Sequence, residues 1–121
     1  MSPSPHRTAL VVDDEEVIRR LVRTVLEADE FVVSEAPDGP VALRTAAEAK
    51  PAIIILDVMM PDMDGVEVCR RLDHEAVKVV MLTARDDPEL ERRCKEAGAD
   101  AFLTKPFSST ELLAVLEGLI G

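Results

Sequence analysis

The sequence predicts a doubly wound α/β fold, with one parallel sheet and helices on both of its faces. Two observations support this prediction. Five short runs rich in β-branched residues alternate with longer stretches of helical period. Strands separated by helices pair in parallel through right-handed crossovers, which place helices on both faces of the sheet. We therefore expect a single-domain (βα)5 sheet of the flavodoxin-like order 2-1-3-4-5.

The expected strands are short aliphatic runs. The third is the most apolar, since it is aliphatic from Ile53 to Leu56 and then stops at Asp57. Such continuous aliphatic runs are typical of strands that are covered on both faces. The five runs are 8–13, 31–35, 52–57, 77–83 and 101–104.

The first expected helix follows the run 8–13 and carries one apolar stripe at helical spacing. We expect the stripe to face the sheet and the charged positions to face water. The stripe consists of Val17, Ile18, Leu21, Val22, Val25 and Leu26, and the charged face of Arg19, Arg20, Arg23 and Glu27.

Four further helices are expected over 40–49, 65–72, 88–97 and 109–120. Their ends carry recognisable signals. Asp87 followed by Pro88 is typical of a helix start, Gly98 of a position just past a helix end, and Ser108 of a cap on the last helix. Because no linker or composition break interrupts the chain, we expect residues 7–121 to form one domain after a loose N-terminal tail, 1–6.

Composition excludes several classes of partner. The 121 residues carry a formal net charge of −10, which would repel nucleic acids and anionic membranes. No apolar run is long enough for a membrane span, and no signal peptide is present. Cys69 and Cys94 form no CxxC pair, so we expect small core or surface residues in a reduced, cytoplasmic setting.

The fold directs attention to the carboxyl ends of the strands, where parallel sheets bind their ligands. Four of the five strands end there in polar groups. These groups are Asp13 and Asp14, Asp57, Thr83 and Lys105. In the order 2-1-3-4-5 the four strands are neighbours, so we expect these side chains to converge. Taken alone, the acids from Asp13 to Glu16 could instead stabilise the dipole at a helix start.

Three converging aspartates favour a hard cation, because like charges within several ångströms disfavour one another's ionisation. Carboxylates with no nearby His or Cys suit Mg²⁺. A lysine and a hydroxyl beside one carboxylate would further neutralise and position a phosphoryl group. Asp57 lies between the other groups, so it is the candidate nucleophile, and its charge at the end of an apolar strand needs such a compensation.

Other functions fit this stretch less well. A calcium loop ending at Gly65 would need acids at positions occupied by Met60 and Arg71. A haloacid-dehalogenase-type phosphatase would need an aspartate where Met59 stands. A flavin or nucleotide binder would need a phosphate-cradling turn after the first strand, whereas this chain has "DDEE". An interaction module of the same fold that is never phosphorylated remains the other alternative.

Four segments resemble the receiver domain of two-component response regulators. They are "LVVDDEE" (10–16), "ILDVMMPDMDG" (55–65), "VVMLTA" (79–84) and "GADAFLTKPF" (98–107). The resemblance implies a signalling switch in which a phosphohistidine on a sensor kinase or phosphotransfer protein gives its phosphoryl group to Asp57. It implies no enzyme beyond the domain's own phosphotransfer and the hydrolysis of its aspartyl phosphate.

The resemblance also implies the metal site. Asp14 and Asp57 would bind Mg²⁺ directly, together with the backbone carbonyl of Met59, and Asp13 would act through water. Lys105 would pair with the phosphoryl group, ahead of a cis bond to Pro106.

The remaining implied roles concern the switch. Thr83 would hydrogen-bond a phosphoryl oxygen, with the backbone N–H of Ala84 nearby, and Phe102 would turn inward. Phosphorylation would then alter the surface of the fourth helix, fifth strand and fifth helix. That surface would control a downstream effector domain or target protein.

Overall fold

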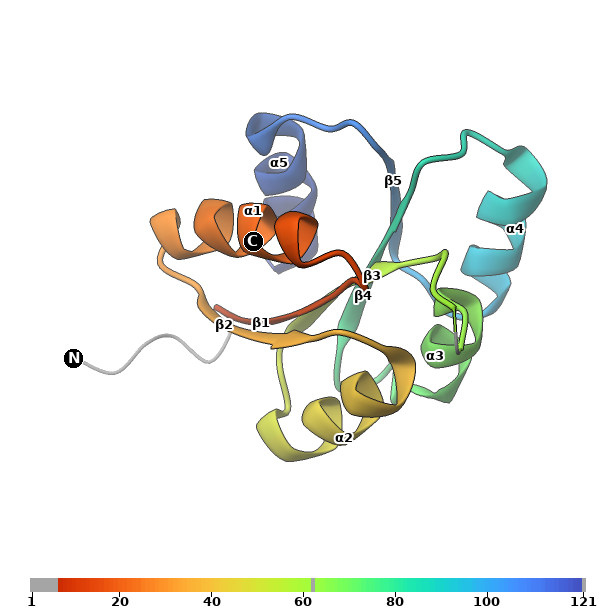
Figure 1. The fold of residues 1–121 in the computed structure, drawn as a ribbon, viewed down its shortest axis with the longest axis horizontal. Helices are drawn as coiled ribbons and strands as arrows, with labels where there is room; N and C mark the ends of the chain where they lie inside the picture. The colour runs from red at the N-terminus through yellow and green to blue at the C-terminus, as the bar shows by residue number, and fades with distance from the viewer. Residues whose placement is uncertain (1–6, 62, 121) are drawn as a thin grey trace.

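The structure, a computed structural model, describes residues 7–61 and 63–120. Its five strands form one parallel sheet in the order β2-β1-β3-β4-β5 (Figure 1). The predicted fold class and strand order are therefore confirmed, whereas the predicted tail 1–6 lies outside the described residues. The strands are β1 (Thr8–Val12), β2 (Val32–Ala36), β3 (Ile53–Asp57), β4 (Lys78–Thr83) and β5 (Ala101–Thr104).

Five helices connect and cover the strands. α1 and α5 lie on one face of the sheet, and α2, α3 and α4 lie on the other (Figure 1). None of the helices in the described residues combines the length and the apolar character that crossing a bilayer requires. The helices are α1 (Glu16–Ala28), α2 (Gly39–Ala49), α3 (Gly65–Arg71), α4 (Pro88–Glu96) and α5 (Ser109–Ile120).

The third strand shows how the sequence produces two hydrophobic cores. Successive side chains of a strand point to opposite faces. Ile53 and Ile55 accordingly pack beneath α1 and α5, while Ile54 and Leu56 pack beneath α2, α3 and α4. All five residues of β3 are buried, including Asp57 at its end. Burial on both faces explains why the run is continuously aliphatic.

The predicted helix ends are confirmed. The Asp87 carboxylate accepts hydrogen bonds from the backbone N–H groups of Glu89 and Leu90, with Pro88 as the first residue of α4. Gly98 has φ +110° after the end of that helix, a conformation that glycine adopts without a steric penalty. The hydroxyl of Ser108 accepts the N–H of Glu111 and caps α5.

The predicted division of α1 into an apolar and a charged face is partly wrong. Val22 and Leu26 are buried, but the side chains of Val17 and Leu21 are 76% and 55% exposed. Arg19, expected to face water, has a side chain only 15% exposed. The helix packs against the core through a narrower strip than the apolar stripe covers, so Val17 and Leu21 remain exposed while Ile18 and Val25 are partly buried.

Both cysteines lie in the core between the sheet and its covering helices. Cys69 and Cys94 are fully buried, and neither forms a disulfide. Burial raises the pKa of Cys69 to about 12, which keeps its thiol protonated and unreactive. The prediction of small core residues is confirmed.

Candidate functional site

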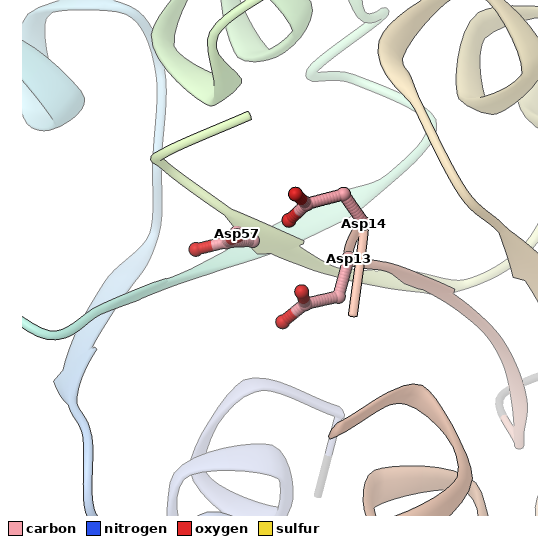
Figure 2. Close-up of side chains that lie close together, drawn as sticks. All are labelled: Asp13, Asp14 and Asp57. Atoms are coloured by element: carbon pink, nitrogen blue, oxygen red, sulfur yellow. The ribbon is translucent and has the colours of Figure 1, made fainter. Parts of the chain in front are cut away.

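Three aspartates meet at the carboxyl edge of the sheet. Asp13 and Asp14 follow β1, and Asp57 ends the neighbouring strand β3. Each contributes a carboxylate oxygen to a group whose members all lie within 4.8 Å of one another. Figure 2 shows the three carboxyl groups directed to the same side of the strand ends. The convergence expected from strand order is thus present in the structure.

Asp57 is the most perturbed of these acids. The residue is 5% exposed, and its Oδ1 accepts a long hydrogen bond, 3.4 Å, from the backbone N–H of Met59. Burial, and then the charge of Asp13, raise the pKa of Asp57 to about 6 against the opposing charge of Lys105. The negative charge of Asp57 is therefore only partly compensated by its neighbours, and such perturbed pKa values are common at functional sites.

Lys105 brings a cation to this edge from the loop after β5. Its Nζ lies 3.0 Å from Asp13 Oδ2 and 3.6 Å from Asp57 Oδ1, and its side chain is 18% exposed. Burial acts to lower the pKa of Lys105, but the hydrogen bond to Asp13 and the charges of Asp57, Asp13 and Glu15 outweigh it and raise the pKa. Lys105 therefore stays charged. The Lys105–Pro106 bond is cis, as the resemblance implied.

Each polar atom of Asp13 makes a hydrogen bond. Its Oδ1 accepts the N–H of Glu15 at 2.9 Å, and its Oδ2 accepts Lys105 Nζ. Its backbone N–H donates to the carbonyl of Ala36 at 3.3 Å, and its own carbonyl accepts Arg19 Nη1 at 2.7 Å. Asp13 is consequently a fixed part of the framework, whereas Asp14 is exposed.

Thr83 and Ala84 complete the edge at the end of β4. The Thr83 hydroxyl is buried and accepts the backbone N–H of Arg85 at 3.1 Å, which leaves its own proton free to donate. Ala84 is exposed beside it. Phe102, in β5, is partly buried and packs against the core beneath α2, α3 and α4. Its predicted inward movement stays a prediction.

The chain leaves Asp57 through a closely packed turn. The N–H of Gly65 donates to the carbonyl of Val58 at 2.8 Å. A Cβ on Gly65 would lie 2.3 Å from the carbonyl oxygen of Asp57, so only glycine fits at this position. The side chain of Met59 is 56% exposed, and the predicted role of its carbonyl as a metal ligand stays a prediction.

The donors at this edge fit a hard divalent cation. Asp13, Asp14 and Asp57 offer oxygen atoms only, two of the three carboxylates are buried, and the groups are close enough to share one ion. Mg²⁺ is held in proteins by one or two carboxylates, backbone oxygens and water. The residues therefore match the cation that the sequence predicts.

Comparison with known proteins gives the family. The sequence profile of the response regulator receiver domain matches residues 9–117. The chain belongs to the response regulator receiver domain family. Members of this family are signalling switch domains and not classical enzymes. The resemblance found in the four sequence segments is confirmed.

Two relatives and a solved structure illustrate the match. The chain is 41% identical over 112 residues to the transcriptional regulatory protein ResD of Bacillus subtilis and 39% identical to SrrA of Staphylococcus aureus. These alignments cover 92% of this receiver domain but 47% and 46% of the relatives, so the chain spans about half the length of either relative. The structure of the chemotaxis protein CheY4 of Vibrio cholerae superposes with a TM-score of 0.87 at 34% identity, covering 93% of this chain and 97% of that one.

Sequence reasoning missed two residues at this site. The sequence predicts that Arg19 faces solvent on α1, and it assigns no functional group to the end of the second strand, where Glu35 lies. In the structure Arg19 contacts both the Asp13 carbonyl and the Glu35 carboxylate. Helical periodicity could not have found them, because one contact is made to a side chain of another element and the other is made to a backbone carbonyl.

An exposed apolar surface adjoins the site. It surrounds a shallow cavity of about 350 Å³ beside Lys105, between the start of α1 and the loops after β4 and β5. The exposed side chains of Val17 and Leu21 lie on this same helix. The residues lining the cavity are Ile18, Leu21, Ala84, Lys105, Pro106 and Phe107.

Proposed function

We propose that this receiver domain accepts a phosphoryl group on Asp57 from a phosphohistidine of a sensor kinase or phosphotransfer protein. The observation that carries the proposal is the meeting of three carboxylate oxygens within 4.8 Å, with the Lys105 ammonium 3.6 Å from Asp57. Such a cluster is costly for folding, because buried like charges repel, and it has a clear use in phosphoryl transfer.

In the proposed step a carboxylate oxygen of Asp57 forms a bond to phosphorus as the phosphorus–nitrogen bond of the phosphohistidine breaks. The bonding electron pair returns to the imidazole of the donor, which takes up a proton. Because the pKa of Asp57 is about 6, most of its carboxyl groups are ionised at neutral pH and can attack. Only positioning and charge neutralisation are then required of the protein.

The neighbouring groups take separate roles. Lys105 would move its ammonium from the carboxylates to the new phosphoryl oxygens. The Thr83 hydroxyl, whose proton is free, would donate to one of these oxygens, near the backbone N–H of Ala84. When bound, Mg²⁺ supplies further neutralisation of charge, and Asp13, Asp14 and Asp57 would hold it with the carbonyl of Met59.

The apolar surface beside Lys105 suits the approach of the phosphodonor protein. Leu21 and Phe107 line the cavity beside Lys105, and Lys105 lies 3.6 Å from Asp57, so a donor histidine that approached Asp57 from this side would pass them. Exposed apolar side chains in one patch are typical of protein interaction sites. We propose that this surface receives the phosphohistidine-bearing segment of the kinase.

The proposed output is a shift between two arrangements of the surface of α4, β5 and α5. Phosphorylation adds roughly −1.5 to −2 charge and strong acceptor oxygens at Asp57. Thr83 ends β4, and Phe102 lies within the adjacent strand β5. Both would respond to that charge and bias the surface that an effector domain or target protein recognises. The cytoplasm, where kinase and target would both be available, is the proposed location.

Intact-mass spectrometry tests the acceptor role. Incubation with acetyl phosphate and Mg²⁺ should add the mass of one phosphoryl group, and Asp57→Asn or chelation should abolish the addition. A mass that stays unchanged with acetyl phosphate and with phosphorylated kinases would contradict phosphorylation and favour a module that is never phosphorylated.

A second measurement tests the docking surface separately. Leu21→Ser should leave labelling by acetyl phosphate unchanged, because the small donor needs no protein contact. The same variant should slow transfer from any phosphorylated histidine kinase that labels the unsubstituted domain. Equal slowing with both donors would point to damage at the site and away from docking.

A further inference from the structure

Arg19 lies outside the carboxylate cluster but contacts its framework. Nη1 of Arg19 donates to the carbonyl of Asp13 at 2.7 Å, and Nε donates to Glu35 Oε1 at 3.1 Å. The side chains of Arg19 and Glu35 are 15% and 23% exposed. A half-buried guanidinium with two fixed partners is more ordered than a surface arginine, so its position bears on what it touches.

The contacted carbonyl belongs to the peptide that joins Asp13 to Asp14. A peptide unit is planar, so fixing its oxygen also fixes its N–H and the orientation of the following residue. Only Asp13, Asp14 and Glu15 separate β1 from the start of α1. The hydrogen bond from Arg19 therefore restricts the direction in which the exposed Asp14 carboxylate leaves the backbone.

Glu35 determines which atom Arg19 can reach. The carbonyl that Arg19 contacts belongs to Asp13, a member of the carboxylate cluster, and a guanidinium without a second partner would be attracted to such carboxylates as a counter-ion. Glu35 on β2 holds it from the other side, and Arg23 Nη1 holds Glu35 Oε2 at 2.7 Å. The hydrogen bond from Arg23, against the effect of burial and with help from Arg19, lowers the pKa of Glu35 and keeps it charged.

We propose that Arg19 is a positioning residue of the cation site. It orients the Asp13–Asp14 peptide for a divalent cation, and Glu35 keeps its guanidinium out of the place the cation would take. This inference rests on the proposed function, since it assumes that the cluster binds Mg²⁺. Partners that orient metal ligands commonly change metal affinity by ten- to a hundredfold.

Calorimetric titration with Mg²⁺ tests the inference, because the two explanations predict opposite changes in Mg²⁺ affinity when Arg19 is replaced. Removing a positive charge beside three carboxylates should, by electrostatics alone, tighten Mg²⁺ binding. If Arg19 positions the site, Arg19→Ala should instead weaken binding, by about tenfold. Arg19→Lys, whose single ammonium cannot bridge both partners, should weaken binding by about threefold.

Two neighbouring arginines give matched controls on the same helix. Arg20 pairs with Glu16 and its side chain is 73% exposed, so Arg20→Ala removes the same charge without touching the Asp13 carbonyl. Arg23 touches Glu35 but no group of Asp13, so Arg23→Ala reports any loss of stability from a weakened ion-pair network. Arg20→Ala should bind Mg²⁺ as tightly as the unsubstituted domain, or slightly more tightly, whereas Arg23→Ala, which removes one partner of Glu35, should weaken binding less than Arg19→Ala does.

A readout without metal completes the test. The N–H of Glu15 donates to Asp13 Oδ1, and its hydrogen exchange should become faster in Arg19→Ala but not in Arg20→Ala. Unchanged or tighter Mg²⁺ binding in Arg19→Ala, or in Arg19→Lys if the alanine variant does not fold, would overturn the inference while leaving the proposed function intact. An unsubstituted domain that binds no Mg²⁺ would overturn both.

Discussion

Charged side chains crowd two regions of this receiver domain, the carboxyl edge of the sheet and the outer surface of α4. On α4 the acids and bases alternate at helical spacing. Arg92 pairs with Glu89 and Glu96, and Lys95 pairs with Glu91, all in largely exposed positions. At the edge of the sheet three aspartates lie together, and the two buried ones, Asp13 and Asp57, share one lysine.

The charged side chains of α4 have little effect on folding, whereas those at the edge of the sheet oppose it. Exposed ion pairs contribute little in either direction, because water screens them. Buried acids that repel one another weaken the fold unless a cation or a proton compensates them. The edge therefore has an energetic reason to bind a cation, and α4 has none. The packing beside Asp57 is close at Gly65, whereas the space around Gly118 on α5 is open.

A change of one methyl group should reveal the tight packing of the edge. A Cβ on Gly65 would meet the backbone of Asp57 and Val58 at 2.3 and 2.8 Å, whereas a Cβ on Gly118 in α5 would meet nothing within 4 Å. Gly65→Ala should cost about 3 kcal/mol or more in the free energy of unfolding, the upper end for overpacking. Gly118→Ala should instead stabilise by up to about 1 kcal/mol through helix propensity. Urea unfolding of both variants measures the contrast, and equal effects would contradict it.

The repulsion at the edge should appear as a dependence of stability on pH. Asp57 has a pKa of about 6 in the fold and 3.8 as its ordinary value, so the folded state resists its ionisation. Without metal, the domain should therefore lose stability relative to Asp57→Asn as the pH rises through 4 to 6. The difference should be near zero below pH 4 and roughly 2–3 kcal/mol at pH 7.

Denaturant unfolding at several pH values, with a chelator present, measures this difference. Glu48 is exposed on α2, so Glu48→Gln provides a matched control with one acid removed elsewhere. The pH dependence of Asp57→Asn is read against this control. A flat difference for Asp57→Asn would mean that its charge is already compensated in the metal-free domain.

Mg²⁺ should restore part of the stability that the cluster loses. A ligand that binds only the folded state adds about 1.4 kcal/mol when its free concentration is ten times Kd. Thermal unfolding should shift upward with added Mg²⁺ and return to its starting point with EDTA. Asp14→Asn should reduce the shift and Glu48→Gln should not. A shift of equal size in both variants would assign the effect to general screening of a chain with net charge −10.

The smallest effect is expected on α4. Arg92→Ala removes two ion pairs from a largely exposed position, and the unfolding midpoint should stay within the error of measurement at physiological salt. A clear loss of stability would mean that the charges of α4 act as a connected network and would weaken the contrast with the edge. Any effect of this variant on a target protein would then reflect recognition and not folding.

The sequence predicted the sheet and the convergence at its edge for a simple physical reason. Continuous aliphatic runs such as 53–56 must be covered on both faces, and parallel strands then end at one edge. Asp13, Asp57 and Lys105 are placed by that rule alone. Their roles in phosphoryl transfer remain proposals, since topology places residues without showing what they do.

What the sequence did not predict depends on contacts between elements. Periodicity shows that residues 17–26 of α1 have an apolar side, but the docking angle of the helix decides that Val22 is buried and Val17 exposed. The same docking brings Arg19 over the Asp13 carbonyl and beside Glu35. Every residue has a backbone carbonyl, so the sequence does not show which carbonyl a side chain contacts.

The exposed side chain of Met59 gives this domain a place for an optical reporter. The chain contains no Trp and no Tyr, so an indole at position 59 would be its only source of tryptophan emission. The predicted metal ligand at this position is the backbone carbonyl, which Met59→Trp retains. Binding and phosphorylation at the neighbouring Asp57 would then be followed in one emission band, in real time and without a label.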